Sequence, residues 1–206
     1  SIMAAPGALV ISKIVWPETE VSETAGTVKL EVKKENANLL DAISQGAAEG
    51  LGVALNVVAM LLGFLALIYL FDFILGSLGG LVGLKLSLEA ILGYLFSGFA
   101  YIMGVPSQDA QAVGGLMGTK LVVNEFVGYL HLKEISSTLQ PVSLVIATFA
   151  LCGFANFSSI AIQVGGIGKI APSRRQDLAK LGVKALICGT LANYLSATIA
   201  GILLWL

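Results

Sequence analysis

The stretch from Leu51 to Phe71 holds 21 consecutive residues without one charged side chain. A helix needs about 20 mostly apolar residues to cross the hydrocarbon core of a bilayer, so this stretch predicts a membrane-spanning helix. Of all 206 residues, 56% are hydrophobic and 12% are charged, whereas about a quarter are charged in a typical soluble domain. We therefore expect an all-α, polytopic membrane protein.

Changes in hydropathy divide the chain into five segments. The run TVKLEVKK, inside a polar region, alternates like a short strand, with a flexible linker as the alternative interpretation. The predicted segments are the end of a transmembrane helix at 1–16, a cytoplasmic linker at 17–50, a transmembrane helix at 51–76, a re-entrant hairpin at 88–132, and a discontinuous transmembrane helix plus the final transmembrane helix at 142–206.

The hairpin is predicted because the apolar pattern at 88–132 is too short and too interrupted for one span. Sixteen apolar residues from Ala90 precede Pro106 and a polar cluster, and the break falls in Gly-Val-Pro-Ser. The pattern then resumes, but it carries Lys120, Asn124 and Glu125. Irregular backbone at membrane depth is tolerated only where protein or water covers it. We expect two short helices that enter and leave on the same side.

The basic residues predict the orientation of the chain. Eight of them fall in the polar linker, the loop around 169–180 and the adjoining helix end, against two in the opposite loops. Loops rich in lysine and arginine stay in the cytoplasm, so both hairpin feet should face the exterior. The eight residues are Lys13, Lys29, Lys33, Lys34, Lys169, Arg174, Arg175 and Lys180, and the two are Lys85 and Lys133.

Glu125 is the first candidate binding residue. A carboxylate in a membrane span costs at least about 2.5 kcal/mol, so such a group usually lines a cavity and binds something. The alternative is a pair with Lys120 that only holds helices together. Five residues apart on one helix, the two side chains would point about 140° apart, which makes a direct bond poor.

Asn156 and Ser159 are the second candidate pair. They lie three residues apart in an apolar run and are expected to share one helix face. An amide and a hydroxyl can both donate to and accept from a polyhydroxylated ligand, although such groups also bond between membrane helices. The glycines of QVGGIG, at 163–168, predict a helix break just after them, and interrupted helices form the substrate sites of secondary transporters.

Other motifs favour packing or exclude function classes. The spacing of Gly76 with Gly80, and of Gly114 with Gly118, predicts close helix packing. A net charge of −1 provides no basic field for nucleic acid. One histidine and two cysteines without CxxC spacing predict no metal site, and no nucleophile–base pair is present, so we expect no enzyme.

Several of these stretches resemble the concentrative nucleoside transporter family. GTKLVVNEFVGY, at 118–129, is similar to the family signature GxKxxxNEFVA(Y), with Gly128 where alanine is usual. The stretches 1–20 and 153–175, and the ending GVKALICGTLANYLSATIAG, resemble the family as well. The resemblance covers nearly the whole chain except the 21–50 region.

The resemblance implies a function and roles for particular residues. It implies a homotrimeric, cation-coupled nucleoside symporter of the inner membrane that works by alternating access. Residues 51–76 would be a scaffold helix, and 88–206 would be part of the mobile transport domain. Glu125, Asn156 and Ser159 would hold the ribose hydroxyls. Phe154 would pack against the base or sugar, and Val53 would supply another apolar wall.

The resemblance also indicates what this chain lacks. The family's Gln-Thr-Glu element, which reads the base, is not found here, and the coupling ion would be bound mainly outside this chain. No other cofactor is expected. We expect sodium, with protons as the alternative, and an N-terminal part of the same protein as partner. The preference for purine or pyrimidine nucleosides is left open. The rival functions are a symporter for another polar solute and a membrane scaffold that transports nothing.

Overall fold

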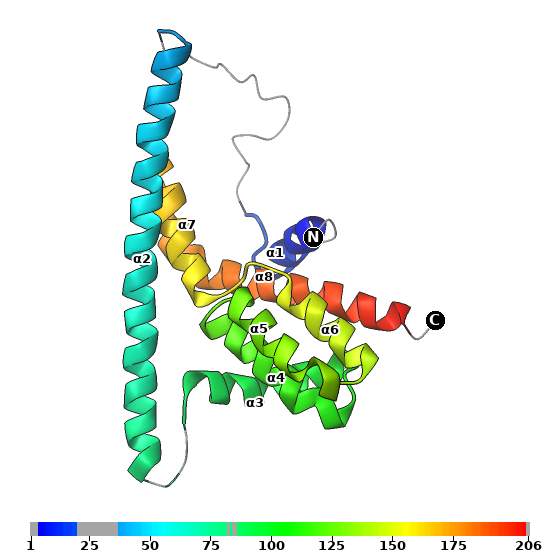
Figure 1. The fold of residues 1–206 in the computed structure, drawn as a ribbon. Coiled ribbons are helices and arrows are strands. Elements are labelled where there is room, and N and C mark those ends of the chain that lie inside the picture. Colours follow the sequence, from blue (N-terminus) through cyan, green and yellow to red (C-terminus); the bar gives the residue numbers. More distant parts are fainter. Residues whose placement is uncertain (1–3, 20–36, 82, 84–85, 205–206) are drawn as a thin grey trace.

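The computed structural model describes residues 4–19, 37–81, 83 and 86–204, and it is helical throughout its regular elements (Figure 1). The predicted all-α fold is confirmed, while the predicted strand at TVKLEVKK lies outside the described residues. The elements are α1 (Ala4–Val15), α2 (Leu39–Leu81), α3 (Leu88–Ile102), α4 (Ser107–Val122), α5 (Glu125–Ile135), η1 (Ser136–Thr138), α6 (Pro141–Leu151), α7 (Phe157–Ile170), η2 (Pro172–Arg174) and α8 (Arg175–Leu203).

Helix α2 is a single rod of 43 residues that stands beside the other helices in Figure 1. Its length of about 65 Å exceeds the thickness of a bilayer. The helix begins much earlier than the predicted span, because Asn38 caps its first turn by accepting the Asp41 N–H at 2.9 Å. The predicted linker at 17–50 therefore runs too far, since its last twelve residues belong to α2.

Helices α3 and α4 form the predicted hairpin, with the turn at Met103–Pro106. Gly104 adopts a φ of +101° in this turn, a conformation that favours glycine. The hairpin is shorter than the predicted 88–132, because Asn124 starts a separate helix, α5. Its side chain accepts the Val127 N–H at 2.9 Å and so caps α5.

Gly114 sets how closely the two hairpin helices approach. A Cβ at this position would lie 2.5 Å from the Ser97 nitrogen and 2.6 Å from the Gly93 oxygen, both backbone atoms. The prediction of close packing is confirmed here. Among the described residues, Gly76 and Gly80 show no such close approach: a Cβ at Gly76 would lie 3.9 Å from the Leu86 oxygen, and a Cβ at Gly80 would meet nothing within 4 Å.

We expect Gly114→Ala to lower the melting temperature of the full-length protein by several degrees, because the α3 and α4 backbones would have to separate. Gly115→Ala, on the same helix, is the matched control, since its Cβ would enter open space. Thermal unfolding in detergent measures the difference. Equal melting temperatures for both variants would contradict the proposed role of this contact.

The discontinuous helix predicted in 142–206 corresponds to α6 and α7, and α8 is the final helix. The interruption does not fall at QVGGIG as predicted; it falls earlier, at 152–156, and α7 runs unbroken through the glycines. The reason is that Asn156 caps α7 and so begins a new helix before the motif. Within the described residues, one helical stretch, Pro172–Leu203, is long and apolar enough to cross a membrane.

The main core lies between the hairpin, α6 and α8. Its fully buried members include Ala100, Val113, Met117, Ile146 and Ala197. A polar contact also ties the hairpin to α6, because the buried Asp109 Oδ2 accepts the Ser143 hydroxyl at 2.6 Å and the Gln140 N–H at 2.9 Å. These helices therefore form one packed unit.

Candidate substrate-binding site

The start of α5 and the start of α7 bring two predicted site residues into contact. The Asn156 Nδ2 donates to the Glu125 Oε2 at 3.1 Å. Glu125 is the first residue of α5, and Asn156 caps α7. Helix N-termini carry a partial positive charge, which stabilises a carboxylate placed beside them. The polar cluster thus combines a negative side chain with two helix ends that favour it.

A capping box fixes the positions of Asn156 and Ser159. The Asn156 Oδ1 accepts the Ser159 N–H at 2.7 Å, and the Ser159 Oγ accepts the Asn156 backbone N–H at 3.2 Å. Asn156 is 0% exposed, so its orientation is strongly restrained. The prediction that Asn156 and Ser159 share one helix face is wrong in detail, because Asn156 is the cap that precedes α7. The Glu125 Oε1 takes no part in the contact with Asn156.

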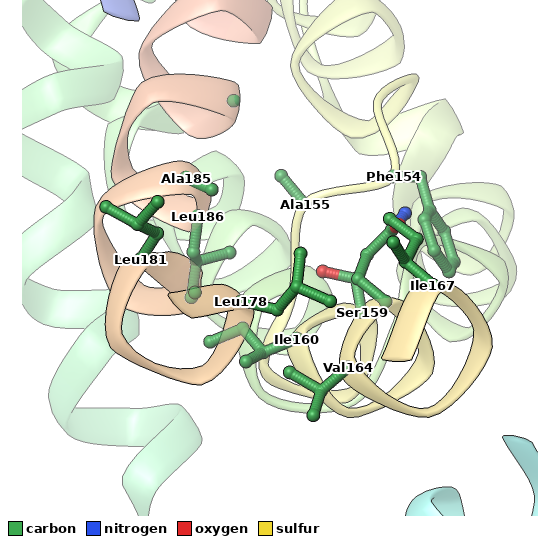
Figure 2. A pocket seen from close by; sticks show the side chains of 13 residues that line it. Phe154, Ala155, Ser159, Ile160, Val164, Ile167, Leu178, Leu181, Ala185 and Leu186 are labelled. Carbon is green, nitrogen blue, oxygen red and sulfur yellow. The ribbon is translucent and has the colours of Figure 1, made fainter. Parts of the chain in front are cut away.

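Phe154 lies in the break between α6 and α7 and is 52% exposed. Together with Ser159 it lines a cavity of about 420 Å³ between α7 and α8. Figure 2 shows these two side chains beside each other, facing Leu181 and Leu186 of α8 across the cavity. Cavities of this size, mostly apolar with a few polar groups, are typical of small-molecule sites.

Val53 does not join this cluster. It faces Gly166 on α7, where a Cβ would lie 4.0 Å from the Val53 Cγ1. This position is about 15 Å along the helix axis from Asn156. The structure therefore brings together four of the five predicted residues, Glu125, Asn156, Ser159 and Phe154, and leaves Val53 farther along α7.

Lys120 is a residue that the sequence suggested only as an alternative partner of Glu125. It is 2% exposed, and its Nζ donates to the Ala150 oxygen at 2.8 Å. The ion pairs found among the described residues do not include Lys120 with Glu125. The last carbonyls of a helix have no partner within it, so Lys120 stabilises the end of α6 at the point where the helix breaks.

We expect Lys120→Met to lower both thermal stability and solute uptake. The replacement keeps the length of the side chain but removes the donor to Ala150, and a hydrogen bond to a charged group contributes about 1.5–3 kcal/mol. Melting temperature and initial uptake rates measure the two effects. Lys133→Met is the control, because Lys133 is exposed on α5. Unchanged behaviour of Lys120→Met would show that the bond does not hold the break.

A helix interrupted beside a buried polar cluster, in a chain this apolar, is a feature found at the substrate sites of secondary transporters. The family model described as "Na+ dependent nucleoside transporter C-terminus" matches residues 1–201. The chain belongs to this family, and it is accordingly a polytopic membrane protein.

Relatives and solved structures support the assignment. The chain is 50% identical to the "Uncharacterized transporter YutK" of Bacillus subtilis, covering 98% of this chain and 50% of the relative. It is 41% identical to the "Nucleoside permease NupC" of Helicobacter pylori, covering 100% of this chain and 50% of that protein. A doubly substituted CNTnw in an outward-facing state matches with a TM-score of 0.85 and 43% identity, covering 98% of this chain and 49% of CNTnw.

The chain spans about half the length of these proteins. It is also similar to CNTnw in an inward-facing, substrate-bound state, with a lower TM-score of 0.69 at 43% identity. That match covers 96% of this chain and 47% of CNTnw. The arrangement of helices described above is therefore closer to the outward-facing structure.

Proposed function

We propose that this chain is the C-terminal part of a cation-coupled nucleoside symporter of the inner membrane, and that it supplies the ribose-binding half of the site. The observation that carries the proposal is the 3.1 Å contact between Glu125 and Asn156 at two helix ends. It leaves the second Glu125 carboxylate oxygen outside the contact.

This pair suits a sugar with neighbouring hydroxyls. The free Glu125 oxygen accepts from the hydroxyls in charge-assisted bonds, which are about twice as strong as neutral ones. The Asn156 amide, 0% exposed in this arrangement of the helices, is proposed to donate to a hydroxyl oxygen when the solute is bound. Phe154, half exposed in the same break, covers an apolar face of the nucleoside. Ser159 keeps Asn156 in place through the capping box.

The coupling ion and the assembly extend beyond this chain. Sodium is the ion that the family description names, and protons are the alternative. An N-terminal part of the protein would hold the ion and read the base. We propose alternating access within a homotrimer, with α2 as the scaffold. The large exposed apolar side chains of α2, among them Leu55, Leu62, Tyr69 and Phe73, suit contact with lipid or other parts of the assembly.

The test is uptake of radiolabelled uridine into proteoliposomes by the full-length protein. We expect uptake with an imposed sodium gradient and little with potassium in its place. A 3′-deoxy nucleoside should compete more weakly, since an unpaired buried acceptor costs about 1–3 kcal/mol. Uptake driven only by a proton gradient would show that the coupling ion is a proton and not sodium. No nucleoside uptake under either gradient, from folded protein, would favour another polar solute or a scaffold that transports nothing.

A further inference from the structure

A second cavity lies where α2, α7 and the start of α8 meet. Its volume is about 180 Å³, and its lining includes Asn56, Gly165, Gly168, Lys169 and Arg175. Unlike the apolar cavity beside Phe154, it is lined by two cationic side chains. Gly168 is about 18 Å along the α7 axis from Asn156, so this cavity is separate from the proposed nucleoside site.

Two glycines make room for the two cations. A Cβ at Gly52 of α2 would overlap the Lys169 ammonium group. Lys169 therefore reaches the α2 backbone at a position where any residue larger than glycine would block it. A Cβ at Gly168 would lie 3.2 Å from the Arg175 Cγ, so the stem of Arg175 lies against α7. Gly52 and Gly168 thus let the two positive charges lie beside the cavity.

Neither cation is neutralised by a carboxylate in the described part of the chain. The ion pairs there are Lys13 with Glu18, and Arg174 with Asp177 at 2.8 Å. Glu49, about one turn before Gly52 on α2, accepts a bond from the Gln45 amide at 2.8 Å instead. The cavity therefore carries an excess of two positive charges. The neighbouring Arg174, by contrast, is paired with Asp177.

We propose that this cavity binds a phosphate-type anion, held by Lys169 and Arg175. A guanidinium binds phosphate oxygens through two parallel N–H donors, and a lysine ammonium adds a point charge. The orientation predicted from the basic loops puts this end of α2 and α7 at the cytoplasmic surface. Basic pockets between helices on that side bind anionic lipid headgroups, so a phospholipid phosphate is the first source and a soluble phosphate the second.

The experiment measures the melting temperature of the full-length transporter as phosphatidylglycerol, phosphatidylcholine or inorganic phosphate is added. A ligand that binds the folded state raises its stability according to its concentration and affinity. We expect phosphatidylglycerol, but not phosphatidylcholine, to raise the melting temperature. Lys169→Gln and Arg175→Gln should each raise the half-saturating concentration about tenfold, whereas Lys180→Gln, an exposed cation outside the cavity, should leave it unchanged.

Gly168→Val tests the cavity without changing any charge. It displaces the Arg175 stem, and we expect it to weaken the phosphatidylglycerol effect as Arg175→Gln does. Stabilisation by inorganic phosphate, lost in the same variants, would support the site and assign it to a soluble anion. An equal loss in Lys180→Gln, or no stabilisation of the unmodified protein by either phosphate source, would overturn the proposal.

Discussion

Glu125→Gln is expected to lower nucleoside uptake by about a hundredfold while the protein stays folded. Glu125 accepts from Asn156 with one oxygen, and its other oxygen is the one proposed to accept from the solute. A glutamine has one acceptor oxygen and one donor nitrogen, so either the Asn156 amide or the ribose faces a second donor. Hydrogen bonds to a charged group contribute about 1.5–3 kcal/mol each, and a factor of ten corresponds to about 1.4 kcal/mol.

Initial uptake rates and equilibrium uridine binding measure this change. Glu134→Gln is the matched control, because Glu134 is an exposed carboxylate on the same helix, α5. We expect the control to transport at the normal rate, and both variants to elute as folded protein on size exclusion. Uptake that is the same in Glu125→Gln and Glu134→Gln would remove Glu125 from the binding site.

Asn156→Asp is expected to abolish uptake at neutral pH without unfolding α7. The new side chain still offers an oxygen to the Ser159 N–H, so the helix cap is preserved. It also replaces the donor of the 3.1 Å contact with a second carboxylate facing Glu125. Two like charges at this distance repel each other strongly, and the amide hydrogen proposed to reach the solute is lost. Uptake and melting temperature separate loss of function from loss of fold.

The double variant Glu125→Gln/Asn156→Asp tests the contact itself. It keeps one carboxylate and one amide but exchanges their positions. The glutamine at position 125 can then donate to the aspartate at position 156. We expect it to recover part of the uptake that Asn156→Asp loses, and the shortfall from additivity measures the coupling between the two residues. Uptake in the double variant no higher than in Asn156→Asp would show that the observed contact does not organise the site.

The sequence is sufficient to predict the membrane class, the hairpin turn and a polar cluster that includes Glu125 and Asn156, which the structure brings into contact. Burying a carboxylate or an amide among apolar residues is costly, so Glu125 and Asn156 were visible as functional candidates without any structure. Gly104 and Pro106 similarly marked the hairpin turn. The resemblance of the stretch around Glu125 to the family signature then predicts that these residues bind a nucleoside, which stays a prediction.

The position of the helix break was not predictable in the same way. The glycines of QVGGIG were the stronger local signal, yet the chain breaks at 152–156. A Cβ at Gly153 would overlap the Asn193 amide, so the broken segment lies directly against α8, forty residues away in the sequence. The role of Lys120 depends on a similarly distant partner, Ala150. Contacts between residues so far apart in the sequence depend on tertiary packing, and a local sequence pattern does not predict them.

The two polar contacts between the hairpin and α6 have a mechanical consequence. Asp109 holds the start of α6, and Lys120 holds its end. Asp109 and Lys120 are about 16 Å apart on α4, so α4 is bonded to α6 near both of its ends. A hairpin that moved away from α6 would have to break both sets of hydrogen bonds. We therefore expect any motion that opens the proposed site to leave α4 and α6 packed together.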